Sequence, residues 1–240
     1  MAKQRLDQAL VQQGLVSTRS QAESYIKLGD VKVDGRVVTK PGAMVDGTTK
    51  LVLAAREQYV SRAALKLASV SEALNLNFQD KIVLDVGSST GGFTDYALRH
   101  GATKVIAVEL GTNQLHPSLR RHKQIELYEK TDIRDFRTDQ KVDVVVADVS
   151  FISLREILPS IIKLVDRNTN IAVMVKPQFE AVTSSVKHKG VIKNDKIRRQ
   201  ILKDFEVWAT QFFRIIGKAD SEVTGSKGNR ERFYLLRLIL

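Results

Sequence analysis

The feature that most constrains what this chain can fold into is an apolar strand that runs directly into a glycine-rich turn. Residues 82–86 are Ile-Val-Leu-Asp-Val, residues 87–93 continue as Gly-Ser-Ser-Thr-Gly-Gly-Phe, and a helix is expected over 92–99. In a doubly wound α/β sheet, such a turn lies beside a nucleotide-like ligand, because glycine lets the backbone approach closely and the helix N-terminus offers free amides. The turn therefore predicts a ligand pocket in a parallel sheet.

The rest of the chain beyond residue 60 supports this fold class. Further apolar runs that suit buried strands lie at 105–108, 125–129, 142–147 and 171–175. Helices are expected between most of them, at 154–164 and 193–213, and an antiparallel hairpin of 213–216 with 233–240 is expected to close the sheet. Apolar strands that alternate with helices indicate an α/β, Rossmann-like sheet covered on both faces.

The first fifty residues have short helical patterns and a hairpin in place of alternating strands and helices, and they predict a separate, small α+β unit. A short helix is expected over 5–13, and a second one begins after a Ser17 cap and stops at Gly29. Residues 31–38 are typical of a hairpin with an Asp-Gly turn, and a further strand is expected over 49–53. We therefore divide the chain into a domain at 1–54, a linker at 55–60 and a second domain at 61–240.

Charge and composition limit the partners. The chain of 240 residues has 38 Lys and Arg against 27 Asp and Glu, which gives a net charge of +11. This charge favours nucleic acid or an anionic membrane as partner, although a charge that only aids solubility would explain it as well.

The composition also limits metal sites and membrane association. The chain has no cysteine, its histidines are scattered, and no metal site is expected. No apolar stretch is long enough to cross a bilayer and no signal peptide is evident, so a cytoplasmic protein without stable membrane association is expected.

The spacing of the glycine turn narrows its ligand. A dinucleotide fingerprint needs glycine at the first, third and sixth positions, but Ser89 stands third, and the Gly-Lys-Ser/Thr of a P-loop is absent. The pattern Asp-x-Gly-x-x-x-Gly-Gly-Phe fits the first motif of S-adenosylmethionine-dependent methyltransferases instead. The candidate cofactor-binding residues in it are Asp85, Gly87, Ser88, Ser89, Thr90, Gly91, Gly92 and Phe93.

Two carboxylates follow the next strands in order. Glu109 ends the second strand, where it can accept hydrogen bonds from both hydroxyls of a ribose, and Asp132 follows the third, where it can accept from the amine of adenine. A tight strand-to-helix connection without any ligand is the competing interpretation.

Four further polar residues are expected around the same cleft. Asp148 and Lys176 end the fourth and fifth strands, Lys66 lies on the helix before the first strand, and Glu231 opens the last strand. Methyl transfer to a ribose 2′-hydroxyl needs a base, and a lysine can serve when burial or a second cation favours its neutral form. Two structural salt bridges would explain the same pattern.

Several strings of residues carry a resemblance to a known family. They are 61–67 (Ser-Arg-Ala-Ala-Leu-Lys-Leu), 147–154 (Ala-Asp-Val-Ser-Phe-Ile-Ser-Leu), 175–180 (Val-Lys-Pro-Gln-Phe-Glu) and 228–231 (Gly-Asn-Arg-Glu). With them, the whole chain resembles the TlyA family of ribosomal RNA methyltransferases, historically labelled haemolysins, with an FtsJ-like (RrmJ-type) catalytic domain. Residues 5–35 are similar to the RNA-binding domain named after ribosomal protein S-four.

The resemblance implies an enzyme, its acceptor and its site. It implies S-adenosylmethionine as cofactor, ribosomal RNA or ribosomal subunits as partner, cytidine as the modified nucleoside, and Lys66, Asp148, Lys176 and Glu231 as a catalytic tetrad in which Lys176 is the general base. RNA phosphates are expected at Lys3, Arg5, Arg19, Gln21, Lys27 and Lys32. Residues 111–115, Gly-Thr-Asn-Gln-Leu, depart from the family's Gly-Tyr-Gly-Gln-Leu and lack its aromatic ring.

Other interpretations stay open at this point. The chain could be a catalytically inert RNA-binding protein or a membrane-active haemolysin. Phe151 and Phe179 could sandwich a base, although we expect at least one of them in the core. A second basic group, either for RNA or simply exposed, is formed by Lys187, His188, Lys189, Lys196, Arg198 and Arg199.

Overall fold

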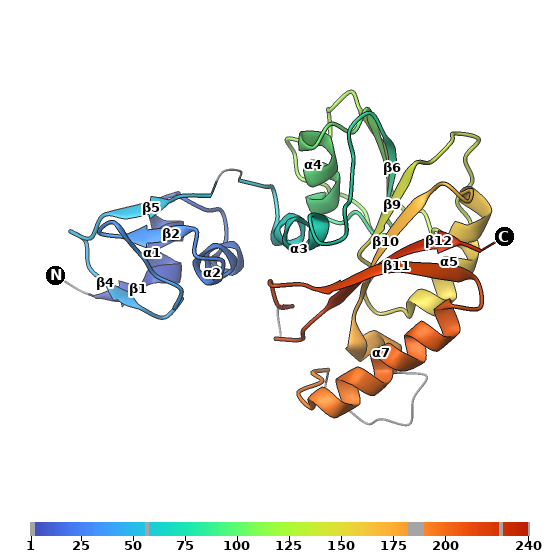
Figure 1. The fold of residues 1–240 in the computed structure, drawn as a ribbon. Coiled ribbons are helices and arrows are strands. Elements are labelled where there is room, and N and C mark those ends of the chain that lie inside the picture. The colour runs from blue at the N-terminus through green and yellow to red at the C-terminus, as the bar shows by residue number, and fades with distance from the viewer. Residues whose placement is uncertain (1–2, 56–57, 182–189, 226–227, 240) are drawn as a thin grey trace.

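A computed structural model of the chain describes residues 3–55, 58–181, 190–225 and 228–239 (Figure 1). Its larger part is built on a seven-stranded sheet of order β11-β12-β10-β9-β6-β7-β8. The strands are β6 (Ile82–Val86), β7 (Lys104–Val108), β8 (Ile125–Tyr128), β9 (Val144–Ala147), β10 (Asn170–Val175), β11 (Phe213–Asp220) and β12 (Arg232–Leu238). Strands β6 to β10 run parallel, and β12 and β11 close the sheet antiparallel. The predicted Rossmann-like sheet is confirmed.

Helices cover both faces of this sheet, as Figure 1 shows. Helices α3 (Arg62–Ser71) and α4 (Gly92–Arg99) lie on one side, and α5 (Leu154–Ile161) and α7 (Asp195–Ala209) on the other. Successive residues of a strand point to opposite faces, so Val83 belongs to the buried cluster under α3 and α4 while Leu84 belongs to the one under α5 and α7. This two-sided burial explains why the strands are continuously apolar.

Several predicted boundaries were wrong, for local reasons. The long helix begins at Asp195 because the Asn194 side chain accepts hydrogen bonds from the amides of Lys196 and Ile197, and it ends at Ala209. The helix expected over 154–164 continues beyond Ile161 only as a 3-10 turn. The strand expected to end at residue 216 runs to Asp220 across a bulge. A four-residue helix, α6 (Pro177–Glu180), was not predicted.

The N-terminal elements form a small α+β unit, which here means residues 3–55. They are β1 (Gln4–Arg5), α1 (Leu6–Gln12), α2 (Arg19–Lys27), β2 (Val31–Val33), β3 (Arg36–Val37), β4 (Met44–Val45) and β5 (Leu51–Leu53). The Asp34-Gly35 turn of the predicted hairpin is present, with positive φ at both residues. Ser17 does not cap α2 as predicted; Thr18 does, because its side chain accepts from the amide of Gln21.

The small unit contacts the larger part through α2, which lies beside α3 (Figure 1). The Gln21 side chain donates to the carbonyl of Tyr59 at 2.8 Å, and the Tyr25 hydroxyl accepts from the amide of Tyr59 at 3.4 Å. The segment after the small unit is therefore held against α2 by two hydrogen bonds. The domain limits at 54 and 61 stay a prediction.

Candidate active site

The glycine turn after β6 has the close backbone contacts that its sequence predicts. Gly87 has a φ of +76°, and a Cβ there would lie 2.9 Å from the carbonyl oxygen of Asp148 at the end of the neighbouring strand. Gly92 begins α4 against α3, where a Cβ would collide with the Ser61 side chain. Glycine is thus required at Gly87 by conformation and at both positions by space.

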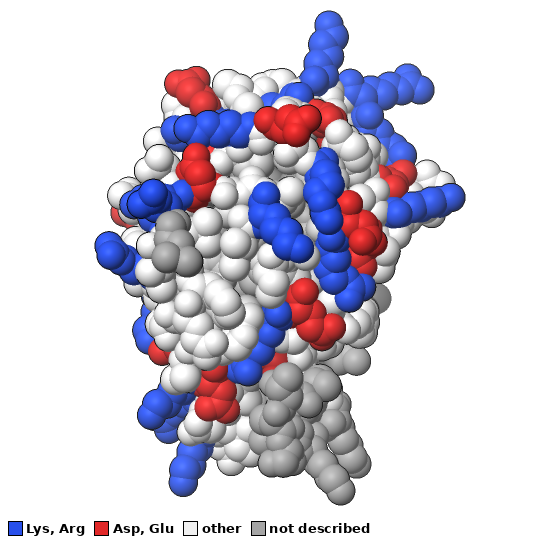
Figure 2. All heavy atoms as spheres, turned by 90° about the vertical axis from the view of Figure 1, so that its right-hand side faces the viewer, with Lys and Arg blue, Asp and Glu red and all other residues white. Residues whose placement is uncertain are grey.

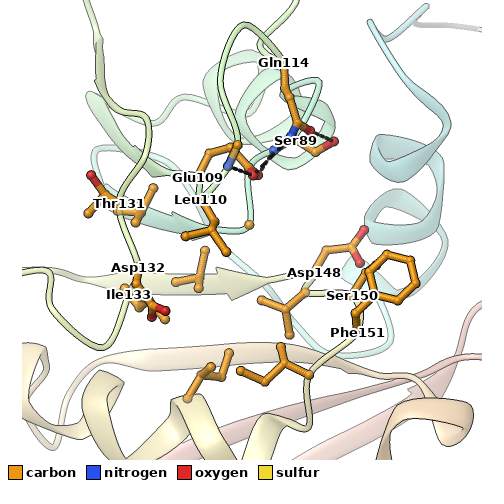
Figure 3. Close-up of a pocket in the computed structure, with 17 residues that line it drawn as sticks. Ser89, Glu109, Leu110, Gln114, Thr131, Asp132, Ile133, Asp148, Ser150 and Phe151 are labelled. Carbon is orange, nitrogen blue, oxygen red and sulfur yellow. Dashed lines mark hydrogen bonds between the residues drawn. The ribbon is translucent and has the colours of Figure 1, made fainter.

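A pocket of about 540 Å³ opens at the carboxyl ends of β6, β7 and β9, and we call it the donor pocket (Figure 3). Its volume lies within the range of small-molecule sites. Figure 3 shows Ser89, Glu109 and Gln114 on one wall, Thr131, Asp132 and Ile133 on a second, and Asp148, Ser150 and Phe151 on a third. Such a crevice beside the strand-order reversal between β6 and β9 is where open α/β sheets bind ligands.

Glu109 keeps acceptor capacity in this pocket. Its Oε2 accepts from the amide of Ser89 at 2.9 Å and its Oε1 from the amide of Gly111 at 2.7 Å, which fixes the carboxylate beside the turn (Figure 3). Each carboxylate oxygen has two lone pairs, so Oε2 can accept a second hydrogen bond from a ligand hydroxyl, and Oε1 can do so in place of its long, 3.4 Å bond from the Gln114 side chain. Asp132 also lines the pocket, but both of its oxygens accept hydrogen bonds from Arg134.

Only part of the predicted cofactor-binding set lines the donor pocket. Gly87, Ser89, Glu109 and Asp132 do so. Asp85, Ser88, Thr90, Gly91, Gly92 and Phe93 do not line it. Phe93 is buried and packs against Phe233, with ring centroids 5.9 Å apart. Within the glycine motif, the structure therefore separates residues that line the pocket from residues that shape the turn.

Asp85 lies fully inside the protein below the turn. Burial raises the pKa of its carboxyl to about 7, the negative charges of Asp148 and Glu109 act in the same direction, and the hydrogen bond from the Thr94 hydroxyl, 2.6 Å long, opposes them. Its Oδ1 and the Ser88 hydroxyl are buried without a partner in the described part of the chain. Two unsatisfied polar atoms under a ligand-sized pocket fit a site that receives a polar or cationic ligand.

The four polar residues predicted around the cleft form two ion pairs. The Lys66 ammonium lies 2.5 Å from Oε2 of Glu231, and the Lys176 ammonium lies 2.6 Å from Oδ1 of Asp148. Lys66, Lys176 and Glu231 are all less than a tenth exposed. Paired burial of this kind satisfies charges that could not be buried singly.

A second pocket of about 400 Å³ adjoins these pairs, and we call it the acceptor pocket. It is lined by Arg62, Lys66, Ser150, Phe151, Lys176, Gln178, Phe179, Gly190, Gly225, Asn229 and Glu231. Ser150 and Phe151 line both pockets, and Asp148, which lines the donor pocket, holds Lys176 of the acceptor pocket. The Asp148–Lys176 pair therefore stands at the boundary between the two.

The expectation that Phe151 or Phe179 belongs to the core was wrong. Phe151 is 91% exposed and has a φ of +67°, a rare conformation for a bulky residue. Its ring lies 5.3 Å from that of Phe179, and both line the acceptor pocket. Phe179 is half-buried, and the exposed Phe151 beside it offers a stacking surface for a flat ring at the pocket.

The residues expected at RNA phosphates differ in availability. Lys3, Lys27 and Lys32 are exposed. Arg5 and Arg19 each lie 2.8 Å from the buried carboxylate of Asp7, which fixes both guanidinium groups at one edge of the small unit. Gln21, which was expected at a phosphate, is buried. Its side chain donates to the Tyr59 carbonyl and accepts from the Ser17 amide.

The second basic group is only partly described. Lys187, His188 and Lys189 lie outside the described residues. Lys196 and Arg199 are exposed on α7, whereas Arg198 is buried and pairs with Asp220 at 2.6 Å. Figure 2 shows one face of the molecule, on which Lys and Arg side chains are interspersed with Asp and Glu. The net charge of +11 is therefore not gathered into one patch on that face.

Sequence reasoning missed several residues that line the pockets. Leu110 and Ile133 provide apolar wall in the donor pocket, and Ser150 borders both pockets. Leu110 is 67% exposed, and its place directly after Glu109 was the available signal. Within the described ranges, no group of three His, Asp or Glu side chains could hold a metal ion. The same ranges contain no helix long and apolar enough to cross a membrane.

Comparisons with known proteins agree with this geometry. Residues 59–238 match the FtsJ-like methyltransferase family, and residues 4–50 match the S4 domain. The chain is 36% identical over 97% of its length to the 16S/23S rRNA (cytidine-2′-O)-methyltransferase TlyA of Mycobacterium tuberculosis, covering 89% of that protein. It is 35% identical over 98% of its length to Hemolysin A of Brachyspira hyodysenteriae, covering all of it. A solved structure from Streptococcus thermophilus, described as a hemolysin, matches 99% of the chain and 89% of its own, with a TM-score of 0.72 and 35% identity.

Proposed function

The chain belongs to the FtsJ-like methyltransferase family, and we propose that it transfers the methyl group of S-adenosylmethionine to the 2′-hydroxyl of a cytidine in ribosomal RNA. The relatives named as rRNA (cytidine-2′-O)-methyltransferases support the acceptor, and the match to the S4 domain supports an RNA partner. We propose the same division as the sequence suggests, with an RNA-binding domain at 1–54, a linker at 55–60 and a catalytic domain at 61–240.

One observation carries the proposal: a buried lysine, paired with a half-buried carboxylate, stands where a donor pocket meets an acceptor pocket. Lys176 lines the acceptor pocket, its partner Asp148 lines the donor pocket, and Ser150 and Phe151 belong to both. A methyl group passing from one pocket to the other must pass this boundary. A base at that point is close to the hydroxyl that receives the methyl group.

The donor pocket fits S-adenosylmethionine in its chemistry. Glu109 can accept from two ribose hydroxyls, Asp132 can share an oxygen with the adenine amine, and Leu110 and Ile133 provide apolar wall in place of the missing aromatic ring. The ionised form of Asp85 would favour the positive end of the cofactor. When bound, this cofactor supplies a methyl group on a sulfonium, an electrophile that needs little activation.

The tetrad supplies the base. With the methyl group supplied by the bound cofactor, Lys176, once it has released its own proton, would take the proton of the 2′-hydroxyl onto Nζ as the oxygen–methyl bond forms. Asp148 holds that nitrogen at 2.6 Å and stabilises the ammonium that results. Lys66, held by Glu231, places a second positive charge in the acceptor pocket, where it can bind the developing oxyanion.

The RNA is held at two places in this proposal. Phe151 and Phe179 stack on the base of the target nucleotide at the acceptor pocket. Phosphates are bound by the small unit through Lys3, Arg5, Arg19, Lys27 and Lys32, and Gln21 is left out of this set because it is buried. Phosphate contacts set affinity, whereas the acceptor pocket selects the nucleoside.

Changing Lys176 to alanine tests the proposal. We expect the variant to bind S-adenosylmethionine in calorimetry within about twofold of wild type, since Lys176 does not line the donor pocket. We expect it to lose at least about 100-fold in tritium transfer to ribosomal subunits, because the base is gone. Lys141→Ala, which changes an exposed lysine, is the matched control and should behave as wild type.

Two outcomes would favour other functions. Wild-type protein that shows no saturable cofactor binding would indicate an inert RNA-binding protein. Lysis of erythrocytes by the purified protein, equal in wild type and Lys176→Ala, would indicate a membrane-active role, as the name of the Brachyspira relative suggests for that protein.

A further inference from the structure

Ser150 makes a hydrogen bond that the tetrad alone does not account for. The Lys176 ammonium donates to the Ser150 hydroxyl at 2.7 Å and lies 2.6 Å from Oδ1 of Asp148. In the described part of the chain these are its two polar partners, and the Phe179 ring, 5.9 Å away, is its aromatic neighbour. Asp148 and Ser150 are two residues apart on the segment that leaves β9.

These two contacts fix the orientation of the lysine nitrogen. An amine nitrogen has three directions besides its bond to carbon, and here Asp148 takes one and Ser150 another. When Ser150 keeps the acceptor role that it has in the structure, both N–H groups of the neutral amine are committed as donors, and the lone pair takes the third direction. Lys176 lines the acceptor pocket, and this remaining direction is the one available to a ligand there.

We propose that Ser150 is a positioning residue that aims the lone pair of Lys176 at the 2′-hydroxyl to be methylated. With Asp148 as the only partner, the amine can turn about its Cε–Nζ bond and present an N–H, which cannot accept a proton. The inference rests on the proposed function, because it assigns a task only if Lys176 is the base.

The position of Ser150 makes the idea testable without loss of the fold. Ser150 is exposed where the two pockets meet, and its hydroxyl supports no helix cap or strand. Ser153, three residues on, offers a matched control, because its buried hydroxyl donates to Glu180 and accepts from the amide of Arg155. Loss of the Ser153 hydroxyl removes a structural bond and leaves the contacts of Lys176 in place.

The experiment is single-turnover methyl transfer to ribosomal subunits that lack the modification, with S-adenosylmethionine saturating. We expect Ser150→Ala to slow the transfer step by about tenfold to 100-fold, with the cofactor Kd and the RNA KM within about twofold of wild type. Ser150→Thr, which keeps the hydroxyl, should restore most of the rate. Ser153→Ala should lower the unfolding midpoint and leave the transfer rate near that of wild type.

The possible results distinguish the positioning role of Ser150 from the proposed ribose methylation. A wild-type rate in Ser150→Ala, or equal losses in the alanine and threonine variants, would overturn the role of the hydroxyl while the enzyme still methylated ribose. Wild-type protein that placed the methyl group on a base, or transferred none, would overturn the proposed function and this inference with it.

Discussion

At the residue scale, the fold controls the charge of Asp85 more strongly than the sequence suggests. Burial of the carboxyl, with two other carboxylates nearby, raises its pKa to about 7, although hydrogen bonds from Thr94 oppose this rise. The folded protein therefore holds a proton between about pH 4 and 7 that the unfolded chain releases. Its stabilising effect is complete below the unfolded pKa and is lost as the pH rises through 7.

Asp85→Asn should remove this pH dependence. Asparagine resembles the protonated carboxyl and can still accept from Thr94, so we expect the variant to match wild type near pH 4 and to be more stable at pH 8. The gain is at most about 4 kcal/mol, since each unit of pKa is worth about 1.4 kcal/mol. Urea unfolding of both proteins at several pH values is the measurement; equal slopes in the two would show that Asp85 is not the group that titrates.

Cofactor binding should depend on the same proton. We expect a positive ligand near Asp85 to favour the carboxylate, so wild-type affinity for S-adenosylmethionine should rise as the pH passes from 6 to 8. Calorimetry in buffers of different ionisation enthalpy would detect the released proton. No proton release, with unchanged affinity, would argue that Asp85 stays protonated in the complex.

At the scale of elements, the short helix α6 is joined to the start of α5 by the side chain of its last residue. Glu180 at its end is 2% exposed and accepts from the Ser153 hydroxyl and the Leu154 amide, both at 2.7 Å, at the start of α5. α6 follows Lys176 directly, and α5 follows the segment that carries Asp148 and Ser150. The pKa of Glu180 is raised, because the effect of burial exceeds the opposing effect of the hydrogen bonds from Ser153 and Leu154.

Glu180→Ala should therefore destabilise the catalytic part more than the loss of an exposed glutamate would. Loss of the carboxylate leaves a helix-start amide and a buried hydroxyl without their acceptor, so we expect the free energy of unfolding to fall by about 2–4 kcal/mol. Glu156→Ala, an exposed glutamate on α5, should change it by less than about 0.5 kcal/mol. Denaturant unfolding measures both, and equal effects would contradict this role.

The sequence predicted the sheet well because its strands and the glycine turn are local patterns. The parallel strands, the two-sided cover and the closing antiparallel hairpin follow from apolar runs and helical spacing, and Glu109 and Lys176 could be placed at strand ends from the sequence. The order of the strands in the sheet was not predicted. The contact of Ser150 with Lys176 could not be predicted, since it joins residues 26 positions apart. The sequence also could not show whether Ser17 or Thr18 caps α2, because adjacent hydroxyl residues are equally suitable and only the backbone geometry distinguishes them.

At the scale of the whole molecule, the small unit and the catalytic part meet through α2 and the segment before α3 (Figure 1). In the proposed function the first binds phosphates and the second modifies one ribose. Changing Lys3, Lys27 and Lys32 together to alanine should then weaken binding to ribosomal RNA and reduce the dependence of log K on log salt by about 2. Cofactor affinity should not change, because these lysines lie outside the donor pocket.

Filter binding at several salt concentrations, with Lys141→Ala as the exposed-lysine control, measures this slope. A slope equal to that of wild type would mean that the small unit does not bind the phosphates of the substrate.

The atom that receives the methyl group tests the proposed function most directly. Ribosomal subunits lacking the modification would be incubated with S-adenosylmethionine and either wild-type protein or Lys176→Ala, digested to nucleosides and analysed by mass spectrometry. We expect 2′-O-methylcytidine with wild type and none with the variant. A methyl group on a base, or the same product from both proteins, would contradict the proposed function.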